Sequence, residues 1–181
     1  MMLKTLVTVM VLTCATVLAQ PRTIRKVDFK NHSYNLLCGD VDRHTPIRVR
    51  NGEFRGKKLG IDTVVNLYKV VYGDLTRDGR DEAVVMYNCG SGASYVFFRA
   101  LLFAMKGNRP VLRAEIAGGN KGDGGFDSIR IRRNQLIVSR EQVGVGGSAC
   151  CPSFIETSRY RWNGRRLVLL AHPTTRKIIA T

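Results

Sequence analysis

Apolar and polar residues alternate with a period of two through much of the chain, and turn-forming residues interrupt this alternation at short intervals. A period of two is typical of β-strands with one buried face, whereas no segment sustains the 3.6-residue period of an amphipathic helix. We therefore predict a mainly β fold: a single antiparallel, hairpin-rich domain of the meander, sandwich or partial-barrel kind. A helical content above about one third, the ordinary globular average, would contradict this prediction.

Four hairpins are predicted from the turn residues. Asn-Gly pairs at residues 51–52 and 163–164 give the strongest signal, because both residue types accept the positive φ that a two-residue hairpin turn needs. Weaker signals place two further hairpins at residues 106–110 and 133–134. Residues 74–82 lie between two apolar runs, so they are predicted to join two strands rather than the two helices of an EF-hand.

Oxygen-bearing side chains are spaced through residues 74–82 in the manner of calcium ligands. Counting Asp74 as position 1, positions 3, 5 and 9 are Thr76, Asp78 and Glu82, and Gly79 at position 6 allows a sharp bend. Calcium takes six to eight hard oxygen ligands, and such a bend brings ligands from both sides onto one ion. A loop of this kind usually stabilises a fold and does not by itself identify a substrate.

The stretch from Gly73 to Val85 resembles the calcium loops of FG-GAP and integrin-like propeller repeats. It resembles still more the single copy found in exported bacterial proteins of the LppP/LprE lipoprotein type. The similarity extends through residues 27–31, 150–152 and 160–164, and so over most of the chain that follows the signal segment. Only one copy of the motif occurs, which excludes a full propeller of four to eight blades.

This resemblance implies a metal site and no catalytic residues. The implied ligands are the Arg80 carbonyl and the side chains of Asp74, Thr76, Asp78 and Glu82. Arg77 departs from the family pattern, where glycine is usual, and Arg77 and Arg80 place two positive charges beside three carboxylates. We therefore expect a weak structural calcium site, with a dissociation constant on the order of 10⁻⁴ to 10⁻³ M.

Residues 1–19 are predicted to be a secretory signal peptide. Lys4 precedes an apolar run over residues 6–18 that is too short to span a bilayer, and Ala19 ends a sequence that a signal peptidase accepts. We predict cleavage before Gln20 and a secreted or periplasmic location. An uncleaved membrane anchor and a lipid attached at Cys14 are the alternatives.

Residues 20–181 are predicted to form a single domain, long enough to bury a core. Its basic ends, residues 21–26 and 175–181, are predicted to be flexible. The segment at residues 118–125 is interpreted as a mobile, glycine-rich surface loop.

Four cysteines follow the signal segment: Cys38, Cys89, Cys150 and Cys151. An even number in an exported chain favours disulfides. A bridge between the adjacent pair requires a strained eight-membered ring, whereas neighbouring residues in an extended segment point to opposite faces. We therefore expect Cys150 and Cys151 each to bond one of the other two. Metal ligation, the competing interpretation, normally uses Cys-x-x-Cys pairs, which are absent.

The sequence contains no recognisable catalytic motif. The histidines occur singly, and no serine stands in a Gly-x-Ser-x-Gly elbow. The carboxylates that could form a hydrolytic pair show no sign of convergence; they are Glu115, Asp127, Glu141 and Glu156. We do not expect an enzyme. The alternative is an envelope hydrolase or inhibitor whose site is assembled from residues distant in sequence.

Charge is the remaining functional indication. The formal balance is +15, which becomes +14 when Lys4 leaves with the signal. Such an excess attracts anionic partners. Arg130 and Arg132 alternate with isoleucines, and Arg159 and Arg161 alternate with serine and aromatic residues, so each strand would carry its arginines on one face. An ordinary solvated strand face is the alternative interpretation.

Three further arginines are expected to extend this basic surface: Arg140, Arg165 and Arg166. Arginine forms bidentate contacts with carboxylate, sulfate or phosphate. We therefore expect a non-catalytic exported binding or structural domain that contacts anionic glycans, lipopolysaccharide or an acidic protein. Nucleic acid fits the charge, but export makes it a less physiological partner.

Overall fold

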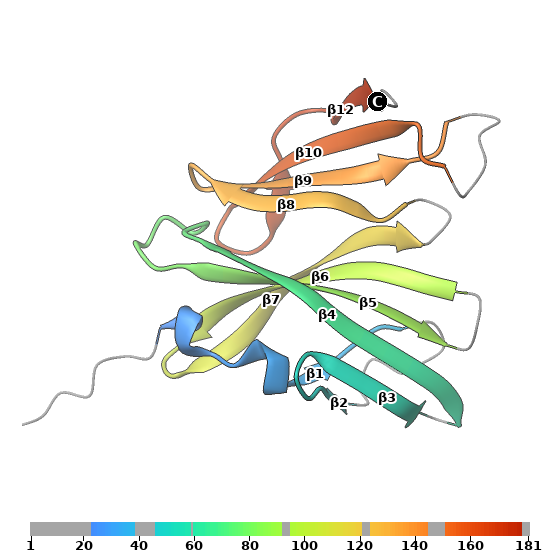
Figure 1. Ribbon diagram of the computed structural model, residues 1–181. Helices are drawn as coiled ribbons and strands as arrows, with labels where there is room; N and C mark the ends of the chain where they lie inside the picture. The colour runs from blue at the N-terminus through green and yellow to red at the C-terminus, as the bar shows by residue number, and fades with distance from the viewer. Residues whose placement is uncertain are drawn as a thin grey trace, which may run out of the picture.

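The computed structural model describes residues 23–38, 46–58, 60–91, 95–120, 124–144 and 151–178. Strands dominate these residues, and all strand pairs are antiparallel, which confirms the predicted fold class (Figure 1). The helices among the described residues are two short 3₁₀ turns, η1 (Ile24–Lys26) and η2 (Phe29–Asn31). Neither is long and apolar enough to cross a membrane. The predicted signal peptide lies outside the described residues.

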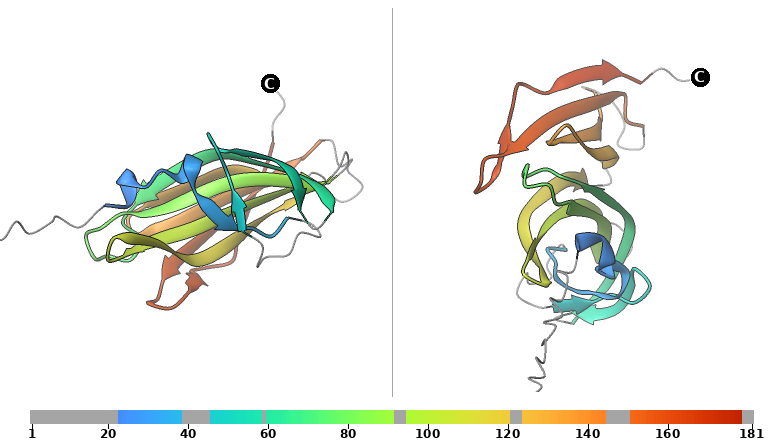
Figure 2. Two further views of the ribbon diagram at one scale, coloured as in Figure 1. Left: turned by 90° about the horizontal axis from the view of Figure 1, so that it is seen from below. Right: turned by 90° about the vertical axis from the view of Figure 1, so that its left-hand side faces the viewer.

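A five-stranded meander forms the larger sheet, in the order β3-β4-β5-β6-β7. Its strands are β3 (Glu53–Lys58), β4 (Ile61–Gly73), β5 (Glu82–Ser91), β6 (Tyr95–Lys106) and β7 (Arg109–Asn120). The pairing register shifts once between β4 and β5 and twice between β6 and β7. Bulges of this kind bend a strand and increase its twist. The sheet accordingly curls round the N-terminal segment without closing into a barrel (Figure 2).

The N-terminal segment fills the concave side of this sheet. It contains η1, η2 and a small pair of strands, β1 (Ser33–Asn35) and β2 (Pro46–Arg48). Ile24, Phe29, Tyr34 and Ile47 from this segment are each at most 3% exposed. Together with Val85 and other inward residues of the sheet, they form the N-terminal core.

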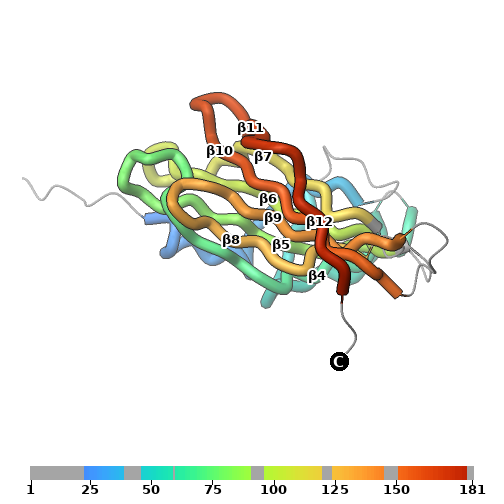
Figure 3. The backbone as a smooth tube through the Cα atoms, turned by 90° about the horizontal axis from the view of Figure 1, so that it is seen from above, coloured from blue at the N-terminus to red at the C-terminus, as the bar shows by residue number. Residues whose placement is uncertain are grey.

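A second sheet packs on the other side of the meander. Its strands are β8 (Phe126–Arg132), β9 (Gln135–Gln142), β10 (Phe154–Trp162), β11 (Leu167–Leu169) and β12 (Thr174–Lys177). β9 lies between β8 and β10, while β11 and β12 both pair with β10. Figure 3 shows this sheet lying across the meander. Ile129, Leu136 and Val138 point into the space between the sheets and form the inter-sheet core with Val84 and Met86.

β5 and β6 therefore lie between two cores. Val85 and Leu101 point into the N-terminal core, whereas Val84 and Leu102 point into the inter-sheet core. A strand covered on both faces needs apolar residues at consecutive positions, which explains the unbroken apolar runs in these two strands.

Three of the four predicted hairpins join paired strands, whereas the turn at residues 51–52 is closed by a single bridge between Arg50 and Glu53, because β2 pairs with β1 and β3 pairs with β4. Asn51 and Gly52 have φ of 52° and 87°, and Arg133 and Asn134 have φ of 50° and 56°, as two-residue turns of the favoured type require. Residues 107–108 form the turn between β6 and β7. The fourth hairpin, between β10 and β11, differs from the prediction because Trp162 pairs with Leu167, which leaves four residues in its loop.

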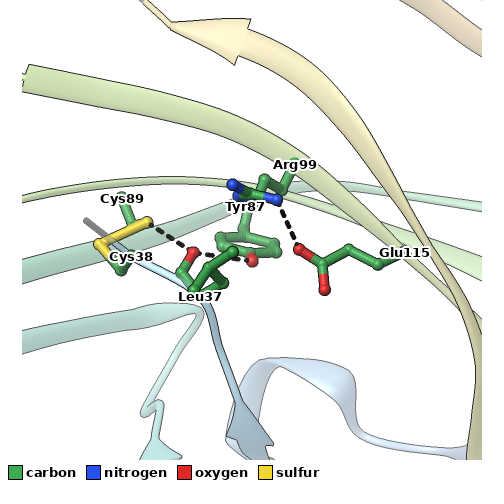
Figure 4. Close-up of polar contacts among 6 residues, drawn as sticks. All are labelled: Leu37, Cys38, Tyr87, Cys89, Arg99 and Glu115. Atoms are coloured by element: carbon green, nitrogen blue, oxygen red, sulfur yellow. Dashed lines mark hydrogen bonds and ion pairs between the residues drawn. A yellow bond between two sulfur atoms is a disulfide. The ribbon is translucent and has the colours of Figure 1, made fainter. Parts of the chain in front are cut away.

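The predicted disulfide pairing is wrong. Cys38 is bonded to Cys89 of β5, with 5.6 Å between their Cα atoms (Figure 4). The reason is that the end of the β1 segment runs over the concave face of the meander, so that Cys38 and Cys89 are both buried in the N-terminal core. Cys151 is exposed, and Cys150 lies outside the described residues.

The same face of the meander holds an ion pair. Arg99 of β6 donates to Glu115 of β7 over 2.7 Å, and both side chains are largely shielded from solvent. Figure 4 shows this pair beside Tyr87, whose hydroxyl donates to the Leu37 carbonyl over 3.4 Å. Glu115, one of the carboxylates considered for catalysis, thus has a structural partner.

Parts of the segments predicted to be flexible have regular structure. Residues 24–26 form η1 with Ile24 buried, and residues 174–177 form β12 on the edge of β10. The interpretation of residues 118–125 as a surface loop is wrong for residues 118–120, and residues 121–123 lie outside the described residues. β7 continues to residue 120, and a Cβ added to the buried Gly118 would lie 2.5 Å from the Phe126 ring. Glycine is therefore required for this close approach.

Candidate functional site

The loop at residues 74–82 joins β4 to β5, as predicted. It is anchored in the protein by Leu75, which is 1% exposed and belongs to the inter-sheet core. A second anchor is Glu82, a residue that is 3% exposed. Its carboxylate accepts hydrogen bonds from the Leu75 and Thr76 main-chain N–H groups at 2.8 and 3.0 Å. Burial raises the pKa of Glu82, while these two hydrogen bonds act in the opposite direction.

The other two carboxylates of the proposed ligand set also hold the backbone. Asp74 accepts from the N–H groups of Arg77 and Gly79 at 2.7 and 3.2 Å, and Asp78 accepts from that of Arg80 at 2.9 Å. The loop is thus ordered by its own hydrogen bonds. Among the residues that the structure describes, no three His, Cys, Asp or Glu side chains converge in a way that could hold a metal ion.

Arg77 has a φ of 67°, and Gly79 has a φ of 78°. Glycine adopts this left-handed region readily, but other residues do so at a cost in free energy. Glycine would therefore adopt the conformation of Arg77 with less strain.

The four arginines named from the sequence lie on one face of the second sheet, the face turned away from the meander. Arg130 pairs with Ile137, and Ile137 pairs with Arg159, so all three side chains form one row across β8, β9 and β10. Arg132 and Arg161 lie two residues further along their strands, and period two places them on the same side. All four arginines are exposed, and we refer to them as the basic face.

Strand geometry gives the dimensions of the basic face. Neighbouring strands are about 4.8 Å apart, so the backbones of Arg130 and Arg159 are separated by about 10 Å. Successive outward residues on one strand, such as Arg130 and Arg132, are about 7 Å apart. Arg176 of β12 extends the face, because it pairs with Ile155, which has the same orientation as Arg159 on β10. Arg176 could not be predicted to lie here, because the basic C-terminal end is expected from the sequence to be a flexible tail.

Arg140 does not belong to the basic face, contrary to the sequence-based expectation. It alternates with Leu136 and Val138 on the inner side of β9, and its guanidinium donates to the Ala117 carbonyl of β7 over 2.8 Å. It also lies 3.9 Å from Glu156. Arg165 and Arg166 are exposed in the β10–β11 loop, where their main-chain N–H groups donate to the Asn163 side chain.

Two of the three histidines lie among the described residues. His32 packs edge-on against Phe29, Tyr34 and Phe103, and burial lowers its pKa. His172 is exposed, and His44 lies outside the described residues.

The chain was compared with known protein families, curated proteins and solved structures, and none of these matches it. The resemblance to LppP/LprE-type lipoproteins therefore stays a prediction.

Proposed function

We propose that this protein is a non-catalytic exported domain that binds an anionic partner on its basic face. The observation that carries the proposal is the row formed by Arg130, Ile137 and Arg159, with Arg132 and Arg161 beside it. Four guanidinium groups arranged on a rigid sheet can contact several sulfate, phosphate or carboxylate groups at once, and each can do so in a bidentate manner.

The overall charge supports the same conclusion. A formal charge of +15, or +14 once Lys4 has left with the signal, produces a long-range field that attracts anionic partners and raises the rate of encounter. The partner classes that fit this field are anionic glycans, lipopolysaccharide and acidic proteins. The arginines of the basic face are about 7 Å apart along a strand and about 10 Å apart across the sheet. This spacing favours a polymer that presents repeated charges over a single small anion.

Export forms part of the proposal. The Cys38–Cys89 disulfide supports it, since disulfides persist in oxidising compartments such as the periplasm and the exterior of the cell. A cleaved signal at residues 1–19 would place the protein there.

A weak structural calcium site at residues 74–82 is the second part of the proposal. Its support is the spacing of the oxygens and the sharp bend at Gly79. An ionised carboxylate has about four lone-pair sites, so Asp74 and Asp78 retain acceptor sites after binding their backbone donors. Glu82 would hold its part of the loop in place through Leu75 and Thr76.

Chromatography on immobilised heparin, a sulfated glycan, tests the binding proposal. The variant Arg130→Gln/Arg159→Gln removes two charges from the basic face. Its matched control, Arg48→Gln/Arg109→Gln, removes two charges from exposed positions on β2 and β7. We expect the first variant to elute at clearly lower salt and to lose at least tenfold in affinity, while the control changes little. Equal losses in both variants would mean that net charge alone produces the binding.

A further inference from the structure

A polar cleft of about 310 Å³ lies where the two sheets meet at one end of the molecule. Four segments that are far apart in sequence contribute to it: the loop at residues 74–82, the end of β6, the middle of β7 and the β10–β11 hairpin. Its charged and aromatic lining residues are Asp78, Arg80, Asp81, Glu82, Arg113 and Trp162. The volume is at the lower end of the range for small-molecule sites.

Trp162 provides an aromatic surface in this cleft. It is the only tryptophan in the chain, it ends β10, and it packs against the inter-sheet core while also lining the cleft. Its neighbours on β10 fix its direction, because Arg161 points to the outer face and Trp162 to the inner one. The ring is therefore held by the core and does not have to be ordered when a ligand binds.

The side chains around Trp162 carry nearly equal numbers of positive and negative charges. Glu82 already accepts hydrogen bonds from Leu75 and Thr76, and Asp81 is paired with Arg25. The Arg80 and Arg113 guanidinium groups and the Asp78 carboxylate remain as donors and acceptors at the cleft. A strongly anionic ligand would meet the carboxylates here, and a cationic one would meet the two arginines.

We propose that this cleft binds a neutral polyhydroxylated ligand, a single sugar ring of a glycan. The apolar face of the ring would lie on Trp162, as flat amphipathic groups pack on aromatic side chains. Its hydroxyl groups would accept hydrogen bonds from Arg80 or Arg113 and donate to Asp78, since each hydroxyl is both a donor and an acceptor. This site is separate from the basic face and does not depend on it. It shares Asp78 with the proposed calcium loop, so the sugar titrations are made in the presence of chelator.

The single tryptophan makes the proposal directly testable, because all indole fluorescence of the protein comes from this cleft. The probes are methyl glucoside, methyl galactoside, N-acetylglucosamine and its disaccharide, each titrated to about 20 mM, with calorimetry as a second measurement. We expect saturable binding of at least one probe in the millimolar range. Arg113→Gln and Asp78→Asn should each weaken it about tenfold, because each replaces a hydrogen bond made by a charged group with a weaker one made by a neutral amide.

Two matched variants serve as controls. Arg109→Gln lies on the same strand as Arg113 but outside the cleft, and Asp62→Asn is an exposed carboxylate of β4; both should bind as the parent does. Three results would overturn the proposal: no saturable binding of any neutral sugar by either method, tighter binding of choline or glucuronate than of the neutral probes, or sugar binding that Arg113→Gln and Asp78→Asn leave unchanged.

Discussion

Asn134 donates a side-chain hydrogen bond to the main-chain carbonyl of Asp74 over 2.7 Å. This contact joins the turn between β8 and β9 to the loop between β4 and β5, and so links the second sheet to the meander at the end where the cleft lies. The β8–β9 turn and the loop at residues 74–82 are therefore joined by a side-chain hydrogen bond, in addition to the packing of Leu75 in the inter-sheet core.

Substitutions at Asn134 should separate this hydrogen bond from the backbone conformation. Asn134 has a φ of 56°, which glycine adopts without strain. We expect Asn134→Gly to lose only the hydrogen bond, at about 1 kcal/mol, and Asn134→Ala to lose the favourable conformation as well, at about 2 kcal/mol. Urea unfolding of the two variants measures both values. Equal destabilisation by glycine and alanine would show that the turn conformation contributes nothing.

Arg77, in the loop at residues 74–82, allows a second test of a positive φ. Replacing it with glycine should stabilise the protein relative to Arg77→Ala by about 1 kcal/mol, because alanine retains the strain of a positive φ. Both substitutions remove the same charge, so their difference reports the backbone alone. Thermal unfolding under identical buffer conditions gives this difference. A more stable alanine variant would contradict the left-handed conformation at this position.

The Cys38–Cys89 disulfide closes a long loop, since its cysteines are 51 residues apart. In the chain-entropy description a loop of this length contributes about 4 kcal/mol to stability. We expect Cys38→Ala/Cys89→Ala to lose about this amount in urea unfolding, while Cys151→Ser changes stability little. Peptide mapping of the oxidised protein checks the pairing, and recovery of a peptide that joins Cys38 to Cys150 or Cys151 would refute it.

The hairpins and the faces of individual strands could be predicted from the sequence, because both depend on neighbours along the chain. The positive φ of Asn51 and Gly52 follows from residue type, and the outward direction of Arg130 follows from its alternation with Ile129. Arg140 alternates with Leu136 and Val138, which point into the inter-sheet core. The same reasoning therefore places Arg140 on the inner face of β9.

What could not be predicted depends on contacts between distant segments. The disulfide depends on the N-terminal segment crossing the concave face of the meander, and no local pattern encodes that path. The cleft around Trp162 likewise exists only because the second sheet packs on the meander. The row from Arg130 to Arg159 required knowing that β9 lies between β8 and β10.

Calcium should raise the melting temperature of the protein modestly. With a dissociation constant on the order of 10⁻⁴ to 10⁻³ M, 5 mM calcium would stabilise the folded state by about 1–2 kcal/mol, or a few degrees. The measurement is a thermal melt in calcium and in chelator. Asp78→Ala should abolish the shift, whereas Asp62→Ala, an exposed carboxylate outside the loop, should retain it. A parent protein that melts at the same temperature in both buffers has no calcium site in this loop.

Glu82 should make the stability of the protein fall as the pH rises. Burial raises the pKa of Glu82 above its ordinary value of 4.5, so the folded state binds this proton more tightly than the unfolded state does. Between the unfolded and the folded pKa the native protein therefore carries more protons, and the free energy of unfolding decreases with pH. This contribution is favourable below about pH 4.5 and is lost as the pH rises through the folded pKa.

The variant Glu82→Gln isolates this effect, because its amide oxygen can still accept from Leu75 and Thr76 but does not titrate. Urea unfolding at several pH values between 4 and 7 should show the stability of the parent decreasing relative to this variant as the pH rises. Glu53→Gln, an exposed carboxylate of β3, should keep the pH dependence of the parent. If the parent instead gains stability relative to Glu82→Gln over this range, the hydrogen bonds from the loop outweigh burial, and Glu82 is a stabilising anion.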